Sequence, residues 1–269
     1  MNNKFPDNID LKKIPLFSYF SDEELMEIKK GLKLETFKRG DAIFSSGDSA
    51  DRMFIVYEGF MKISMYLSDG REQILYIYKK DDFVGGFNIL YQDKYVYNAA
   101  ATTNAKIIVI NKYDFENIML KNRDFVLKVL EEAYYRIRKS EELIDRLSVI
   151  NADMKVAKAL INLIKISGSI NDGVITVDLK INREEMGSFT GLTRETISRK
   201  LSQFQDEGII TLERNKIIIN DIKKTFRQNY MMNLDKGAQN QLFVHFRYIG
   251  DFICYLTQLA TLCSSQSFA

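Results

Sequence analysis

The sequence predicts an α+β protein with an N-terminal antiparallel β-roll, a long helix and a C-terminal winged helix-turn-helix. Three observations predict this order. Short β-rich runs separated by glycine turns fill residues 34–110, a heptad pattern without proline or glycine fills 121–151, and two short helices followed by a β-hairpin are expected over 182–220. The chain of 269 residues, 46% hydrophobic and 28% charged, is long enough for two domains that each bury a core.

The N-terminal part begins with a short helix, because Ser21 and the acidic residues 22–24 form a helix cap before apolar residues at helical spacing. Turns such as Asp69-Gly70 then separate runs that are rich in β-branched and aromatic residues. We expect strands at residues 42–45, 53–57, 61–67, 73–78 and 106–110. Many short strands at this spacing predict a small antiparallel barrel or roll over residues 1–120.

The heptad segment, residues 121–151, predicts a long helix that pairs with a second copy of the chain. A helix packed on its own domain is the alternative, but the narrow seam favours a two-stranded coiled coil. The expected seam residues, at the two core positions of the heptad, are Val126, Ala133, Ser140 and Leu147 together with Leu130, Ile137 and Ile144.

The C-terminal part, residues 152–229, has the layout of a winged helix. A helix over 153–166 ends at Ser167-Gly168, and a strand over 174–179 follows. After two further helices, residues 209–212 and 216–220 are expected to form two strands joined by a tight turn.

The two helices between Asn182 and Gly208 carry the predicted function. Asn182 and Glu185 form a capping box, Gly191 turns the chain, and Thr193 caps the second helix. Ile197, Leu201 and Phe204 form the buried stripe of that helix, and the outward residues near its start are Arg194, Glu195, Ser198 and Arg199.

The outward side chains have the chemistry needed to read DNA bases. An arginine binds guanine O6 and N7 together, a glutamate accepts from cytosine N4, and a serine serves either base type. Glu195, Ser198 and Arg199 are therefore expected to read bases. The cations and the cap are better placed for phosphates, which position a protein without specifying sequence; this set comprises Arg194, Thr193, Arg214 and Lys216.

The segment Leu192–Leu201, followed by Glu207-Gly-Ile-Ile210, resembles the recognition-helix signature of the CRP/FNR superfamily. The glycine-bearing turns of that family's effector domain are similar to Lys38–Asp41, Phe44–Asp48, Met53–Gly59 and Asp81–Gly85. The resemblance covers about residues 17–226. It implies a cyclic-nucleotide-binding-like β-roll, a dimerising helix and a winged helix, with double-stranded DNA, a second copy and RNA polymerase as partners.

Within the superfamily, Glu195, Ser198 and Arg199 are similar to the FNR-like subgroup, which implies a palindromic operator with TTGA-like half-sites. In that resemblance Arg199 reads the guanine, Glu195 the cytosine and Ser198 an outer thymine.

The effector is expected to be a small molecule other than cyclic AMP. Gly86 stands where the cyclic-nucleotide members have a ribose-binding glutamate, and Tyr97-Asn98 stands where they have a phosphate-binding Arg-Ser pair, so a cyclic phosphate is expected to meet no cation. A pocket for a small aromatic or other organic effector is expected at Tyr76, Phe83, Gly85, Gly86, Phe87, Tyr97 and Asn98. The alternative is that these aromatic residues only form the core and surface of the roll.

Several other functions are disfavoured. Because Cys254 and Cys263 are the only cysteines and His245 is the only histidine, an FNR-type iron–sulfur cluster and a histidine metal site are not expected. No phosphate-binding glycine loop or catalytic triad suggests an enzyme. The remaining alternative is a ligand-binding or scaffold protein of the same fold without DNA binding.

The ends of the chain complete these expectations. The N-terminus lacks an apolar signal region, which predicts a cytoplasmic protein. Charges within the apolar run 242–262 disfavour a membrane span, and residues 230–269 are interpreted as an added helix or an extension foreign to the fold.

Overall fold

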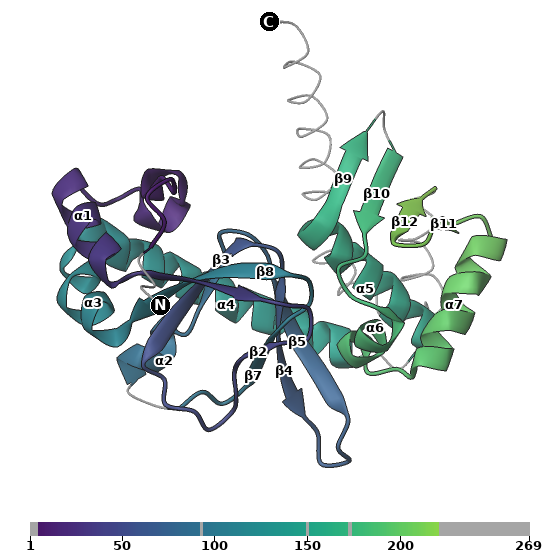
Figure 1. Ribbon diagram of the computed structural model, residues 1–269. Coiled ribbons are helices and arrows are strands. Elements are labelled where there is room, and N and C mark those ends of the chain that lie inside the picture. Colours follow the sequence, from purple (N-terminus) through teal and green to yellow (C-terminus); the bar gives the residue numbers. More distant parts are fainter. Residues whose placement is uncertain (1–4, 92–93, 149–150, 172–173, 221–269) are drawn as a thin grey trace, which may run out of the picture. The chain divides into compact units, whose positions relative to one another are not determined.

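The computed structural model describes residues 5–91, 94–148, 151–171 and 174–220 (Figure 1). These residues form two compact units: residues up to 148 together with Lys180–Ile197, and residues 151–179 together with 198–220. Each unit is described separately. No helix in this part of the chain is both long and apolar enough to cross a membrane. The tail over 230–269, with the run 242–262, lies outside the described residues.

The roll consists of two four-stranded antiparallel sheets, ordered β1-β8-β3-β6 and β2-β7-β4-β5. The strands of the first sheet are β1 (Lys33–Phe37), β8 (Ala105–Asn111), β3 (Arg52–Glu58) and β6 (Phe83–Val84). Those of the second are β2 (Ala42–Phe44), β7 (Asn98–Ala101), β4 (Met61–Tyr66) and β5 (Glu72–Tyr78). The expected β-roll and its five expected strands are confirmed, to within one residue at most ends.

The central strands β3 and β8 have buried side chains on both faces. Met53 and Ile55 of β3 belong to one core cluster, whereas Phe54 and Val56 belong to the other, which fills the space between the sheets. Because side chains alternate across a strand, a strand between two cores must be apolar at successive positions. This explains why residues 53–56 form a continuous apolar run rather than an alternating one.

Short helices gather around one end of the roll (Figure 1). The longest, α1 (Asp22–Gly31), begins with a capping box in which Ser21 Oγ accepts from Glu24 N and Glu24 Oε2 accepts from Ser21 N. The others are α2 (Gly86–Tyr91), α3 (Lys112–Asn117) and the 3-10 helices Leu11–Lys13, Pro15–Phe17 and Met119–Lys121. Ile28 of α1 and Phe115 of α3 are buried in the first core cluster.

The long helix α4 spans Arg123–Ser148, within the predicted segment 121–151. Its first turns are anchored, because Phe125 and Val129 are buried in the first core cluster. Beyond this point large apolar side chains become exposed, including Leu130 at 60% and Ile137 at 61%.

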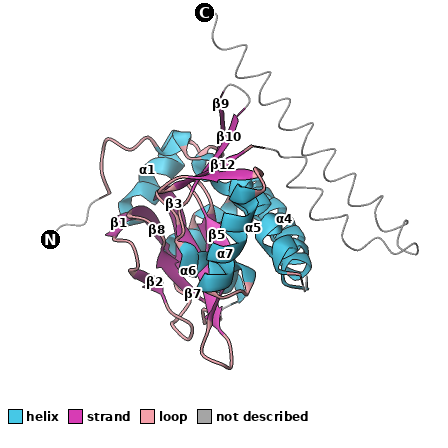
Figure 2. Cartoon of the chain, turned by 90° about the vertical axis from the view of Figure 1, so that its right-hand side faces the viewer, coloured by secondary structure: helices cyan, strands magenta, loops and turns pink. Residues whose placement is uncertain are grey.

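The second unit contains α5 (Ala152–Ser167) and an antiparallel sheet of order β11-β12-β10-β9. The strands are β9 (Gly168–Asn171), β10 (Val174–Asp178), β11 (Ile210–Leu212) and β12 (Lys216–Ile219). Figure 2 shows β9 and β10 as a pair of neighbouring strands. The predicted wing hairpin β11–β12 is present, and β12 also pairs with β10, so the wing is the edge of a larger sheet. The remaining helices are α6 (Arg183–Thr190) and α7 (Arg194–Asp206), which continues into the second unit.

Candidate functional site

The turn between α6 and α7 is built from short backbone contacts. Gly191 ends α6 in the left-handed region at φ 70°, where glycine has no steric penalty, and its N–H bonds to Gly187 O. Leu192 N also donates to Gly187 O, at 3.1 Å. A Cβ at Gly187 would lie 2.7 Å from Leu192 O, so glycine permits the close approach of the two helices. The capping box of Asn182 and Glu185 is confirmed.

Helix α7 presents the predicted reading residues at its N-terminal half. Arg194, Glu195, Ser198 and Arg199 are all exposed. The buried stripe predicted for this helix, Ile197, Leu201 and Phe204, is confirmed. Thr193 Oγ1 accepts from Thr196 N at 3.2 Å, which confirms Thr193 as the cap of the helix. The exposed face is therefore free to meet base edges while the opposite face holds the helix in the protein.

The other predicted phosphate contacts lie on the wing. Arg214 stands in the turn between β11 and β12, Lys216 begins β12, and both are exposed. Two amides fix the wing beside the end of α7: Gln205 Oε1 accepts from Leu212 N at 2.9 Å, and Asn220 Nδ2 donates to Gly208 O at 3.4 Å.

A cavity of about 260 Å³ lies between the roll and α4. Of the seven residues predicted for the effector pocket, Tyr76 and Tyr97 line it. The rest of the wall comprises Phe44, Ile63, Ile77, Tyr78, Asp82, Val84, Asn88, Tyr95 and Val96 from the roll and Glu132, Tyr135, Arg136, Lys139 and Ser140 from α4.

The other five predicted pocket residues lie elsewhere. Phe83 is buried in the first core cluster and Phe87 packs against it. Gly86 lies against Met53, where an added Cβ would be 3.3 Å from the sulfur, and Gly85 closely approaches Arg52 O. Asn98 Oδ1 accepts from Ser46 N at 3.0 Å. The sequence interpretation assigned these side chains to the cavity because they adjoin it along the chain, whereas the pleat and the α2 turn direct them into other contacts.

The structure corrects the expectation that the pocket contains no cation. Arg136 and Lys139 reach it from α4, a helix that the sequence interpretation assigned to dimerisation alone. Arg136 donates to Phe83 O, and its guanidinium lies 4.9 Å from the ring centre of Phe87 and 5.3 Å from that of Phe83. These contacts hold the guanidinium in one place.

Acidic groups face these cations. Burial raises the pKa of Asp82 and of Glu132 above their ordinary values, and the neighbouring Arg136 and Lys139 partly oppose this effect. Burial also raises the pKa of Tyr95 to about 12. The cavity therefore combines tyrosine rings with two acids and two bases, which suits a small molecule with an aromatic body and polar groups.

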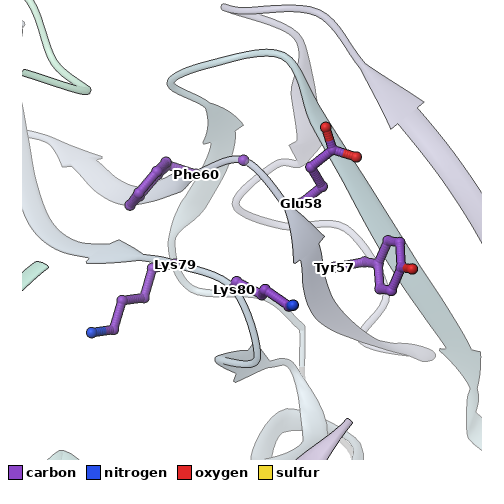
Figure 3. Close-up of a pocket in the computed structure, with 6 residues that line it drawn as sticks. Tyr57, Glu58, Phe60, Lys79 and Lys80 are labelled. Atoms are coloured by element: carbon purple, nitrogen blue, oxygen red, sulfur yellow. The ribbon is translucent and has the colours of Figure 1, made fainter. Parts of the chain in front are cut away.

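A second, more open cavity of about 390 Å³ lies at the β3–β4 turn (Figure 3). Tyr57 and Glu58 border it from the end of β3, Phe60 from the turn, and Lys79 and Lys80 from the segment after β5. Glu58 and both lysines are exposed, and none of the predicted pocket residues lies there. The cavity beside α4, where tyrosines and charged groups converge, is the stronger candidate for an effector site.

The predicted seam on α4 is partly exposed. Leu130, Ile137 and Ile144 are 60%, 61% and 68% exposed. Exposed apolar side chains on one helix face are typical of a protein–protein interface. Val126, Ala133 and Leu147 are half-buried. Ser140 is exposed but lines the cavity, with its Oγ 3.0 Å from Tyr76 Oη. Sequence reasoning missed Leu127 and Tyr134, which are 44% and 65% exposed and continue the apolar stripe at heptad spacing.

Comparisons with known proteins match two domains along the chain. The cyclic nucleotide-binding domain matches residues 34–122, and the Crp-like helix-turn-helix domain matches residues 154–224. The CRP-like cAMP-activated global transcriptional regulator of Mycobacterium tuberculosis is 24% identical over 218 residues, which are 81% of this chain and 97% of that protein. The transcriptional activator protein FnrL of Cereibacter sphaeroides is 26% identical over 211 residues, 77% of this chain and 84% of that protein.

The fold is also similar to that of a solved structure. The structure of FixK2 from Bradyrhizobium japonicum superposes with a TM-score of 0.64 at 20% identity, covering 73% of this chain and 96% of FixK2. The matched domains, in the same order along the chain, carry the roll and the helix-turn-helix described above. The chain is therefore a DNA-binding transcription regulator of the CRP/FNR superfamily.

Proposed function

We propose that this regulator binds, as a homodimer, a palindromic operator with TTGA-like half-sites, under control of a small effector held between the roll and α4. The observation that carries the proposal is the exposed set Glu195, Ser198 and Arg199 on α7, directly after the Gly191 turn. This set is similar to that of the FNR-like subgroup. A scaffold protein that had lost DNA binding would have no need for three base-reading side chains on one exposed face.

The experiment separates base reading from phosphate binding. Arg199→Ala is expected to cost about 1–3 kcal/mol on the operator and to relax specificity at the guanine. Arg194→Ala is expected to weaken binding to operator and random DNA alike and to make the salt slope shallower by about one unit. Binding is measured on a palindromic TTGA site and on scrambled DNA over a salt series. Equal weakening of both DNAs by Arg199→Ala would contradict the assigned reading role.

The homodimer is proposed to form through α4. The exposed stripe of Leu127, Leu130, Tyr134, Ile137 and Ile144 is apolar and recurs at heptad spacing, and a second copy of the same helix is the partner that such a stripe fits. A dimer also matches the two-fold symmetry of a palindromic operator. RNA polymerase in the cytoplasm is the proposed further partner, since the relatives above are transcription regulators.

The effector is proposed to be a small aromatic or other organic molecule rather than cyclic AMP. Arg136 and Lys139 already face Glu132 and Asp82, so a phosphate would compete with carboxylates for both cations. Gly86, at the position expected for a ribose-binding glutamate, does not line the cavity and lies against Met53.

A further inference from the structure

The cations on α7 differ in exposure. Arg194 and Arg199 are exposed, whereas Lys200 is half-buried. Lys200 Nζ lies 2.7 Å from Asp153 Oδ1, and the two side chains are only 18% and 22% exposed. Lys200 is therefore engaged within the protein, one residue away from the arginine proposed to read guanine.

Asp153 is itself held in place. It is the second residue of α5, and the cap Asn151 accepts through Oδ1 from Asp153 N at 2.7 Å and from Met154 N at 3.3 Å. A carboxylate in the first turn of a helix is also stabilised by the helix dipole. The partner of Lys200 is thus a charge in the capped first turn of a helix.

Further polar contacts extend this link along α7. Lys200 Nζ donates to Gln203 Oε1 at 3.1 Å, and Gln203 Nε2 donates to Glu207 Oε1 at 2.8 Å. One row of polar contacts therefore runs from the start of α5 to Glu207, the residue that follows α7.

We infer that Asp153 and Lys200 are positioning residues that set the rotation of α7 about its own axis and so aim Ser198 and Arg199 at the bases. This inference rests on the proposed base-reading role of α7. The apolar contacts of Leu201 and Phe204 hold the helix in the protein but are not directional. The ion pair joins two specific points, one on α7 and one on α5, and because both side chains are little exposed it is weakly screened by salt. Successive residues on a helix point about 100° apart, so fixing Lys200 inward fixes the direction of Arg199 outward.

The test compares full-length variants on operator and scrambled DNA. Asp153→Asn keeps the shape of the side chain and removes its charge, and Lys200→Met keeps most of the length and removes the ammonium. Each is expected to lower the ratio of operator to scrambled affinity about tenfold, the equivalent of weakening one base contact. The double variant is expected to lose no more than either single variant, because the two residues act as a pair.

Two variants serve as controls. Lys200→Arg retains a cation that can reach Asp153, so it is expected to keep the ratio within about twofold, which a general packing defect would not allow. Glu131→Gln removes the charge of a side chain that is 70% exposed on α4 and is expected to keep the ratio unchanged. Circular dichroism at the assay temperature confirms that each protein is folded.

The outcomes are distinct. If Arg199→Ala lowers the ratio but folded Asp153→Asn and Lys200→Met keep it, or lower both affinities by one factor, the positioning role is overturned and base reading stands. If Arg199→Ala also keeps the ratio, the proposed base reading and this inference fall together.

Discussion

At the residue scale, the contacts of Arg136 determine its orientation in the wall of the cavity beside α4. It lies on the rings of Phe83 and Phe87, donates to a backbone carbonyl and faces the carboxylates of Glu132 and Asp82. The residues at 132, 135, 136 and 139 recur at helical spacing and line the cavity together. That spacing was available in the sequence, but the heptad interpretation used only one face of the helix, so these residues were not predicted.

Glu132 makes the stability of the protein depend on pH. Because burial raises the pKa of Glu132, the folded state holds its proton more tightly than the unfolded state. The stability that this proton contributes is present at low pH and is lost as the pH rises through the folded pKa. Glu132→Gln removes that loss, so the stability of the variant relative to the wild type is expected to increase as the pH rises above the ordinary value of 4.5.

Urea unfolding at several pH values checks this expectation. Glu131→Gln is the matched control, because the carboxylate of Glu131 neighbours Glu132 on the same helix and its side chain is 70% exposed. Parallel pH profiles for Glu132→Gln and the wild type would show that the buried carboxyl does not titrate differently on folding.

At the element scale, periodicity predicted the elements with strong local signals. The helices α4, α5 and α7 and the strands β3, β4 and β5 all lie where the pattern placed them. The strand β7 was missed because its sequence Asn-Ala-Ala-Ala has little β-propensity; it is a strand because it pairs with both β2 and β4. The two-residue β6 is likewise defined by its pairing with β3. Tertiary pairing, which a single sequence does not display, determines such elements.

Charged substitutions in the apolar stripe of α4 are expected to prevent the proposed dimerisation. Ile137→Glu with Ile144→Glu places two like charges from each chain in the seam, where desolvation and repulsion oppose pairing. Sedimentation is expected to show monomers. Arg123→Glu is the control, because this residue lies at the start of the same helix with its side chain 85% exposed, and it is expected to remain dimeric. Dimers in the double variant would place the interface on another element.

At the scale of the whole molecule, DNA binding depends on local rather than bulk charge. Because the net charge is only +2, we expect the exposed arginines of α7 and the cations of the wing to supply the contacts to DNA. The proposed effector cavity and the apolar stripe share α4, with Arg136 lining the cavity and Ile137 belonging to the stripe. The two proposed binding events, effector and second copy, therefore meet on a single helix.

The whole protein is expected not to respond to cyclic AMP. Its cavity cations are opposed by Asp82 and Glu132, and Gly86 supplies no carboxylate for a ribose. Calorimetry is expected to show no saturable heat above that of dilution into buffer, and cyclic AMP is expected to leave the operator affinity unchanged. Micromolar binding coupled to tighter operator binding would contradict the proposed effector class.

The burial of β3 on both faces has a consequence for mutational tolerance. Met53, Phe54, Ile55 and Val56 are at most 1% exposed, so a polar substitution at any of the four leaves an unsatisfied group in one of two cores. In β10 only alternate residues, Ile175 and Val177, are buried. In a library of all single substitutions, selected for activity with a transcription reporter, polar residues are expected to be excluded at each of positions 53–56. In β10 they are expected to be excluded only at every second position. Lineages of this protein would then diverge at the rim of the roll while the middle of β3 changes only among apolar residues of similar volume.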